Sequence, residues 1–207
     1  LKQGIYYIIG SVMVLVGIFF ANQPDAQNIS PQLTGFIEIV SDRGIQRISF
    51  PTGKIEKILK RDLYEIISFD LSPNGTSRIL WADKKGDFLP DKIILSNGSP
   101  LQVILNKDFV RLPSFSPKNK EFAYLYSKYD PTDQIWFKPW SLFLANLHGS
   151  SNRKGTELPL SFYRPSWFSD GRRIAVTTID YAIYIVDIET NAEKKIIDFG
   201  AGPAISP

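Results

Sequence analysis

The sequence contains no cysteine and a single histidine in 207 residues. The absence of cysteine excludes disulfides, thiolate catalysis, lipid attachment at cysteine and zinc sites built on cysteine. The one histidine, His148, lies beside a glycine in the stretch NLHGSS, a setting more typical of a turn than of a catalytic base. With so few ligand-type side chains, the sequence predicts no metal site and no cofactor.

Motifs for catalysis and for phosphate binding are missing as well. There is no Gly-x-Ser-x-Gly elbow for a nucleophilic serine and no GxxxxGK[ST] loop for a nucleotide. The stretch from Asp83 to Asp91 does not match the spacing of a calcium loop. We therefore expect that this chain has no catalytic activity of its own.

Long runs of one charge are also absent. The formal net charge is only +3, and no block of five or more like charges occurs. Binding to nucleic acid usually requires such a concentration of positive charge, so no nucleic-acid partner is expected. A hydrophobic content of 43% indicates instead a chain with a packed core.

The N-terminal end carries an apolar run, GIYYIIGSVMVLVGIFFA, which covers residues 4–21 without a charge. A membrane-spanning helix needs about 20 apolar residues, so the run predicts a transmembrane anchor. Lys2 precedes it, and no Lys or Arg follows before Arg43. The positive-inside rule then places residues 1–3 in the cytoplasm and the chain after a linker at 22–28 outside it.

A cleaved signal peptide is the alternative interpretation of this run. The tripeptide Phe19-Phe20-Ala21 lacks a small residue at the first position, and Pro24-Asp25-Ala26 is also a poor cleavage site. We therefore favour an uncleaved anchor. Both interpretations export the rest of the chain to the periplasm or the cell surface.

A short turn recurs along the exported part. Copies are ISFDLSPNGTSRILW (67–81), LPSFSPKNKEFAYLY (112–126) and RPSWFSDGRRIAVTT (164–178), with a fainter copy from residue 28 and a last one at 202–207. Their shared serines fall at positions 30, 72, 116, 169 and 206. Repeats of 40–45 residues are typical of propeller arrays.

The residue types of this turn fit a structural role. Proline presets φ for a turn, an adjacent Asn or Asp bonds its own backbone, and glycine supplies positive φ. We therefore assign the recurring positions of the repeat to the fold and not to catalysis. These structural turn residues are Ser72, Pro73, Gly75, Ser116, Pro117, Ser169, Asp170 and Gly171.

Each repeat reads as four strands. One strand enters the serine turn and one leaves it; a variable loop, a third strand, a second turn and a fourth strand follow. The predicted fold is an all-β β-propeller of four-stranded blades over residues 29–207, preceded by one transmembrane helix. The expected blades are 29–67, 68–111, 112–163 and 164–201, with the start of another at 202–207.

The repeat resembles the TolB-like, or PD40, propeller repeat, a relative of WD40 with the pattern W/F-S-P-D-G-[KR]-x-[IL]-A-[VF]. WFSDGRRIAV (167–176), FSPKNKEFAY (115–124) and LSPNG (71–75) carry the resemblance, although the usual proline is absent at Ser169. The family's propellers commonly have six or more blades. The resemblance therefore implies that four blades and the start of a fifth belong to a longer propeller.

Spacing assigns the functional face. In a propeller, the loops after the second and fourth strands of each blade share one face, and the longest such loop is SKYDPTDQIWFKPW at 127–140. Its aromatic side chains suit a binding surface, or else fold back onto the blade. The candidate binding residues are Tyr129, Asp130, Asp133, Trp136, Phe137 and Trp140, together with Arg111 and Arg164 near the exits of fourth strands.

These observations predict a membrane-tethered, extracytoplasmic propeller that binds a protein or peptide. TolB-like repeat proteins of bacterial envelopes act as interaction platforms, which is what the resemblance implies here. The alternative is the gating propeller of a prolyl-oligopeptidase-like serine peptidase, whose catalytic domain would lie beyond residue 207. A Gly-x-Ser-x-Gly elbow downstream would distinguish the two.

Overall fold

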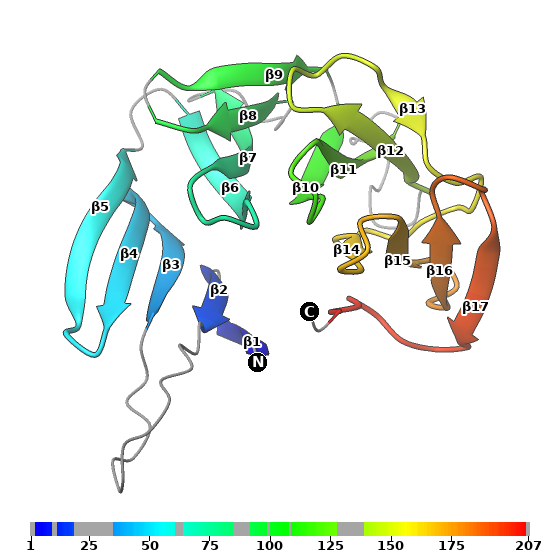
Figure 1. Cartoon of the computed structure of the whole chain (residues 1–207), viewed down its shortest axis with the longest axis horizontal. Helices are drawn as coiled ribbons and strands as arrows, with labels where there is room; N and C mark the ends of the chain where they lie inside the picture. The colour runs from blue at the N-terminus through cyan, green and yellow to red at the C-terminus, as the bar shows by residue number, and fades with distance from the viewer. Residues whose placement is uncertain are drawn as a thin grey trace, which may run out of the picture. The chain divides into compact units, whose positions relative to one another are not determined.

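The computed structural model describes residues 3–9, 12–18, 35–60, 64–84, 92–98, 100–107, 109–127 and 139–205 (Figure 1). Every regular element in these ranges is a β-strand, and the strands form four antiparallel sheets. The prediction of an all-β fold is therefore confirmed. The chain divides into two compact units, of which the first holds Leu1–Glu65 and the second holds Ile66–Ile205.

The first unit contains a five-stranded sheet in chain order. Its strands are β1 (Gln3–Ile9), β2 (Val12–Ile18), β3 (Gly35–Ser41), β4 (Gly44–Phe50) and β5 (Lys54–Lys60). Glu38 lies directly opposite Arg47, and their side chains form an ion pair of 2.7 Å. The Cζ atom of Arg47 also lies 3.9 Å from the ring centroid of Phe36. Such cross-strand contacts stabilise the register of the β3–β4 hairpin.

Apart from Gln3, strands β1 and β2 fall within residues 4–21, where the sequence predicts one continuous transmembrane helix. Their backbones pair in antiparallel register from Gln3 opposite Ile18 to Ile9 opposite Val12. Ile, Val and Tyr, which dominate this run, favour strands as well as apolar surroundings, so periodicity cannot separate the two states. Among the described residues, no helix is long and apolar enough to cross a membrane. The predicted linker at 22–28 and Ser30 lie outside the described residues.

The second unit contains three four-stranded sheets. The first comprises β6 (Tyr64–Leu71), β7 (Arg78–Lys84), β8 (Lys92–Ser96) and β9 (Gln102–Asn106). The second comprises β10 (Val110–Phe115), β11 (Glu121–Tyr126), β12 (Ser141–Asn146) and β13 (Arg153–Lys154). The third comprises β14 (Ser166–Trp167), β15 (Arg173–Thr177), β16 (Ile183–Asp187) and β17 (Glu193–Ile197).

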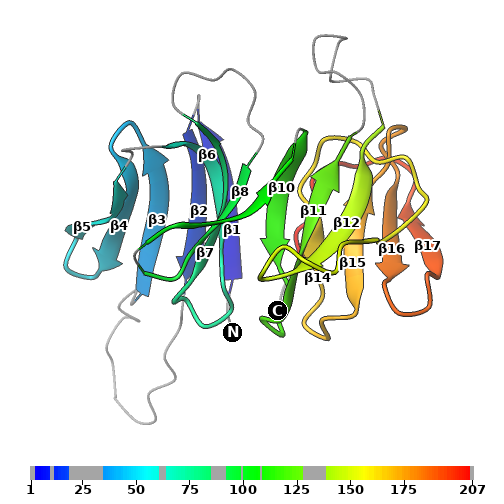
Figure 2. The same ribbon diagram turned by 90° about the horizontal axis from the view of Figure 1, so that it is seen from above.

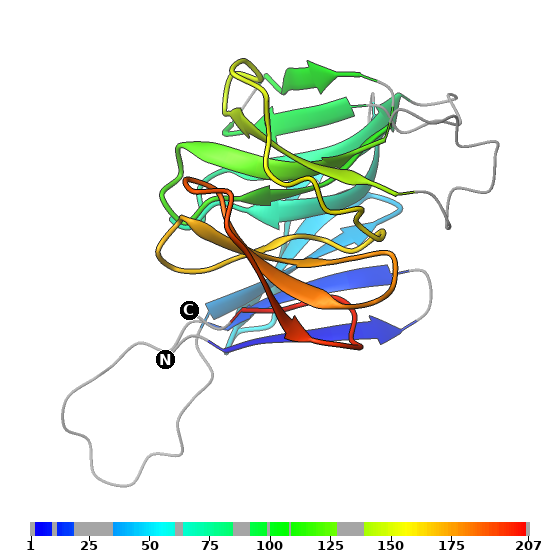
Figure 3. The ribbon, with the colours of Figure 1, turned by 90° about the vertical axis from the view of Figure 1, so that its right-hand side faces the viewer.

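Within the second unit, each sheet follows the predicted plan of four strands in chain order. Figure 1 shows β6, β10 and β14 on the inner side of their sheets and β9, β13 and β17 on the outer side. Figures 2 and 3 show the sheet β10–β13 next to the sheet β14–β17. This arrangement is that of consecutive propeller blades.

The recurring turns close the first hairpin of each of these sheets. The backbone N–H of Gly75 donates to the carbonyl oxygen of Ser72 at 2.8 Å, and Asn119 donates to Ser116 at 2.9 Å. In the third sheet Gly171 donates to Phe168 at 3.0 Å, so the turn begins at Phe168. Ser169 therefore occupies the position of Pro73 and Pro117, one place later than the serines that open the other two turns.

The backbone conformation at the fourth position of each turn explains which residue type occurs there. Gly75, Asn119 and Gly171 have φ of 73°, 55° and 61°, in the left-handed region. Glycine adopts this conformation freely, and asparagine is among the side chains that tolerate it best. The repeat is therefore a backbone requirement of the hairpin, as the turn chemistry predicts.

Two apolar clusters hold the three sheets together. One joins the first sheet to the second through residues such as Ile79, Ile93 and Phe122, all fully buried. The other joins the second sheet to the third and includes Leu142 and Ile174. Burial of such side chains stabilises a fold by about 1.5–3 kcal/mol each, which makes the stacked sheets one compact body.

Candidate binding site

The structure describes three of the eight candidate binding residues. Trp140 lies immediately before β12, Arg111 lies on β10, and Arg164 lies shortly before β14. The other five candidates fall in residues 128–138, outside the described residues, and they are Tyr129, Asp130, Asp133, Trp136 and Phe137. The description of the site therefore starts from Arg111, Trp140 and Arg164.

Arg111 is surrounded by three aromatic rings. Its Cζ atom lies 5.2 Å from the ring centroid of Trp81, 5.1 Å from that of Trp140 and 5.2 Å from that of Phe162. The rings also contact one another, with Phe162 centred 5.9 Å from Trp81 and 5.5 Å from Trp140. We call these four residues the Arg111 site. Each contact of a cation with a ring is worth about 0.5–2 kcal/mol, depending on desolvation.

The strand register places this site at one end of the sheets. Arg111 pairs with Leu125 near the end of β11, and Trp140 precedes Ser141, which pairs with Tyr126 at the same end. Trp81 lies in the middle of β7, so Arg111 and Trp140 define the end of the sheets to which the site belongs. The site therefore occupies the end of the sheets that carries the loops after the second strands, which is the face that the sequence assigns to function.

The backbone beside Arg111 is irregular. Phe109 and Leu112 both have left-handed φ, of 62° and 49°. The pairing of β10 with β11 shifts register between Arg111 and Ser114, as in a β-bulge. Bulky residues in such conformations cost about 1–3 kcal/mol each and concentrate at functional sites. The strand is thus distorted at the residue whose side chain the three rings surround.

Three nitrogen atoms of this site are buried and have no hydrogen-bond acceptor within the described ranges. They are Nε of Arg111 and Nε1 of Trp81 and Trp140. The three side chains are 7%, 6% and 3% exposed, so each residue is more than nine-tenths buried. Desolvation lowers the pKa of Arg111 from its usual value. A buried donor without an acceptor costs about 1–3 kcal/mol, and a charged one costs more.

Arg164 has partners within the fold. Its two terminal nitrogens donate to the carbonyl oxygen of Phe69 at 3.0 Å and to Oγ of Ser68 at 3.1 Å. Beside them, Asp70 accepts from the backbone N–H of Phe115 at 2.8 Å. Desolvation raises the pKa of Asp70, and the charge of Arg164 acts against this effect. Arg164 and Asp70 thus connect β6 to the two following sheets.

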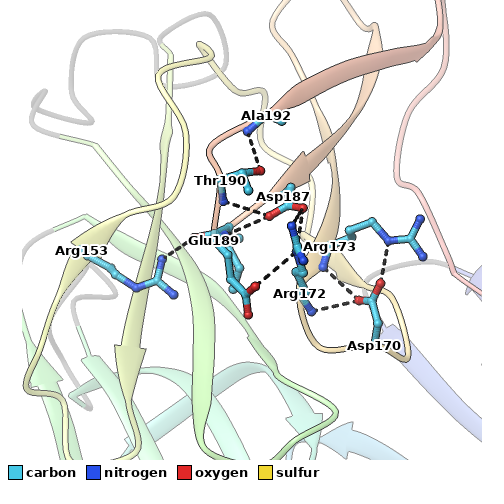
Figure 4. Close-up of polar contacts among 9 residues, drawn as sticks. Arg153, Asp170, Arg172, Arg173, Asp187, Glu189, Thr190 and Ala192 are labelled. Atoms are coloured by element: carbon cyan, nitrogen blue, oxygen red, sulfur yellow. Dashed lines mark hydrogen bonds and ion pairs between the residues drawn. The ribbon is translucent and has the colours of Figure 1, made fainter.

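The opposite end of the third sheet carries charges that are paired (Figure 4). Asp170 accepts from the backbone N–H of Arg172 and Arg173 and from Nε of Arg173 at 2.6 Å. Desolvation acts to raise the pKa of Asp170, but these hydrogen bonds outweigh it and lower the pKa to about 2. A hydrogen bond from Arg172 holds the pKa of Asp187 well below its usual value. These pairs stabilise the turns at this end of the sheet.

Sequence reasoning missed two members of the Arg111 site. Trp81 is typical of an ordinary core residue of a strand. Phe162 lies in the short stretch LSFYRP, in which Arg164 was chosen as the candidate. Neither has a local signal of binding, because the site forms only where separate strands converge. In the described part of the chain, no three His, Cys, Asp or Glu side chains gather as a metal site would require.

No protein-family model and no curated protein sequence matches this chain. Solved structures do. TolB from Acinetobacter baumannii matches with a TM-score of 0.62 and 18% identity, over 90% of this chain and 49% of that one. A putative TolB from Agrobacterium tumefaciens matches with a TM-score of 0.59 and 18% identity, over 84% of this chain and 65% of that one.

A nidogen/laminin complex also contains a similar chain, with a TM-score of 0.60 and 12% identity, over 82% of this chain and 62% of that one. The present chain thus spans about half to two thirds of the length of these structures. At such low identity the likeness concerns the fold alone. The sheets of this chain match the blades of the TolB propeller and of other β-propellers.

Proposed function

We propose that this chain is a propeller scaffold that binds a protein or peptide at the face carrying the Arg111 site. The observation that supports this function is a buried guanidinium between three aromatic rings, whose Nε has no acceptor among the described residues. Tryptophan and arginine are the side chains that most often dominate binding energy at protein interfaces. A distorted strand at the same residue adds to the case for function.

Binding fits this site better than catalysis. Its four residues are an arginine, two tryptophans and a phenylalanine, and none of these serves as a nucleophile or general base at neutral pH. They can supply ring surface, a fixed positive charge and N–H donors. Such groups hold a ligand in place, so we assign no reaction to this chain.

A peptide selection tests this function. Peptides are selected by display against the purified full chain, and their affinities are then measured for Phe162→Ala and for the matched control Phe168→Ala. Phe168 also lies beneath an arginine, Arg173, with 4.7 Å from Cζ to the ring centroid, but at the opposite end of its sheet. We expect Phe162→Ala to weaken binding by about tenfold or more and the control to change it little.

Two results of this selection would contradict the proposal. One is that no peptide is enriched above a scrambled library. The other is that both phenylalanine variants bind the selected peptides as the wild type does. Thermal unfolding of each variant, followed by circular dichroism, separates a loss of binding from a loss of fold.

The proposal includes a membrane tether at residues 4–21. Eighteen residues without a charge support it, because they are long enough to span a bilayer, and Lys2 before them supports export of the rest. A phosphatase fused after residue 207 should be active, and the fusion should stay in the membrane fraction after an alkaline wash. Deletion of residues 1–21 should release it.

The strands β1 and β2 give the opposite expectation for the same experiment. If the run serves the five-stranded sheet instead, the full-length protein will be found outside the membrane fraction. The deletion variant will then unfold at a lower temperature, because β3 loses its paired neighbour β2. That combination would contradict the tether and leave the binding function standing.

A further inference from the structure

The Arg111 site presents three N–H donors that have no acceptor among the residues that the structure describes. They are Arg111 Nε, Trp81 Nε1 and Trp140 Nε1. All three residues contact the ring of Phe162. More than nine-tenths of buried polar groups in native proteins are hydrogen-bonded, so three exceptions in one cluster call for an explanation. A bound acceptor would satisfy them together.

Two other arginines that stack on a ring, both in the described part of the chain, show which acceptor is expected. Arg47 lies over Phe36 and binds the carboxylate of Glu38 at 2.7 Å. Arg173 lies over Phe168 and binds the carboxylate of Asp170 at 2.6 Å. In both cases an arginine on a ring is completed by a carboxylate from the same chain.

Arg111 also lies against aromatic rings, and it differs from these two arginines in one respect. It has three rings instead of one, yet none of the described Asp or Glu side chains forms an ion pair with it. The planar guanidinium matches a carboxylate in shape and charge. A carboxylate from another molecule would complete Arg111 as Glu38 completes Arg47 and Asp170 completes Arg173.

We propose that the Arg111 site binds a carboxylate of a peptide ligand, with an apolar side chain of that ligand against the rings of Trp81, Trp140 and Phe162. This inference rests on the proposed peptide-binding function and specifies the group that is recognised. A phosphate group fits less well, because phosphates are usually held by several cations. Arg111 is the single cation that contacts these rings within the described ranges.

The carboxylate could belong to a C-terminus or to an Asp or Glu side chain, and two pairs of probes separate these sources. N-acetyl-phenylalanine is compared with its amide, and acetyl-Phe-Glu-amide is compared with acetyl-Phe-Gln-amide. Each probe is titrated into the full chain by isothermal titration calorimetry. We expect the acid of at least one pair to bind about tenfold or more tightly than its uncharged partner.

Variants then locate the binding at this site. Arg111→Gln should abolish the preference for the acid, and Arg111→Lys should restore part of it. Trp81→Phe and Trp140→Phe keep a ring but remove an N–H donor, so each should weaken binding of the acid by about threefold to tenfold. Arg173→Gln is the matched control, because this stacked arginine already has Asp170 as its partner, and it should leave binding unchanged.

The acid and amide comparison uses the wild-type chain, so it holds even if Arg111→Gln fails to fold. Equal binding within both pairs, or no binding of any probe, would overturn the carboxylate inference. Displacement of the acid by inorganic phosphate at a lower concentration would also overturn it. If peptides selected by display still bind in those cases, the proposed function stands; if none binds, both fail.

Discussion

The indole Nε1 of Trp167 donates a hydrogen bond to the carbonyl oxygen of Ser114, 3.2 Å away. This bond connects the first strands of two consecutive sheets, β14 and β10. Trp140 differs, because its buried Nε1 has no acceptor among the residues that the structure describes. The two tryptophans are 9% and 3% exposed, so they form a matched pair for measuring what an indole hydrogen bond contributes.

We expect Trp167→Phe to lower the free energy of unfolding by about 1 kcal/mol more than Trp140→Phe does. Both substitutions remove similar buried volume, but only the first breaks a hydrogen bond. Urea unfolding at pH 7, followed by circular dichroism in the absence of ligand, measures the difference. Equal losses for the two variants would show that the bond between the sheets contributes nothing.

Gly149→Ala should be far more destabilising than Gly75→Ala. Both glycines have φ of 73°, so alanine meets the same backbone strain at each. A Cβ atom at position 149 would lie 1.7 Å from the carbonyl oxygen of Ile104, whereas nothing lies within 4 Å of one at position 75. We expect the clash to add about 2 kcal/mol or more to a strain of about 1 kcal/mol.

The denaturant midpoints of the two glycine variants measure this difference. Gly149 lies in the turn between β12 and β13, and Ile104 lies on β9, so the result reports how closely two outer strands of neighbouring sheets approach. Similar midpoints for both variants would mean that the sheets are separated there by more than the structure shows.

Asp170→Asn should weaken the fold at neutral pH but not at low pH. The pKa of Asp170 is lowered to about 2, below the ordinary value of about 3.9, so its charge stabilises the folded state above pH 4. That contribution disappears as the pH falls from 4 to 2. Because the side chain is 36% exposed, solvent screening limits the loss at pH 7 to about 1 kcal/mol or less.

Asparagine keeps an oxygen that can accept from the backbone of the turn, so this substitution isolates the charge. Unfolding free energies of both proteins are measured at pH 7 and at pH 3 and below. A difference that stays constant across this range would show that the effect comes from the shape of the turn and not from ionisation.

Asp70→Asn should have the opposite dependence on pH. Desolvation raises the pKa of Asp70, so the folded state holds its proton more tightly than the unfolded state. The wild type therefore loses stability as the pH rises above the ordinary carboxyl pKa, and the variant does not. We expect the variant to be at least as stable as the wild type at pH 7, with the difference shrinking toward pH 4.

Thermal unfolding across pH 4–7 measures this effect. If Asp70→Asn were clearly less stable at pH 7, then the charge of Arg164 and the hydrogen bond from Phe115 would outweigh desolvation. Together, the two aspartates test whether a lowered and a raised carboxyl pKa shift the stability of one chain with pH in opposite directions.

Local chemistry made the fold of the second unit predictable. The positive φ of Gly75, Asn119 and Gly171 requires residues that tolerate it, so the hairpins can be recognised from the sequence. The predicted register of the third turn was wrong by one residue, because Ser169 was aligned with the serines of the other turns but takes the place of their proline. The hydrogen bonds of the backbone, and not the residue type, show which residue begins the turn.

The N-terminal run and the Arg111 site were harder to predict, for different physical reasons. An uninterrupted apolar run has no period, so strands β1 and β2 could not be distinguished from a helix. Trp81, Arg111, Trp140 and Phe162 are separated by up to 81 positions, and nothing local indicates that they converge. Arg111 and Trp140 were predicted from their loops, but their shared contacts with Phe162 required the structure.

The Arg111 site also bears on how such a chain can acquire a new activity. Its members occupy four different positions within the repeat: a second strand, a first strand, the entry to a third and the exit from a fourth. Duplication of any one repeat would copy the turns faithfully but could not copy the site. The binding specificity of this protein would therefore have to arise from sequence differences between adjacent repeats.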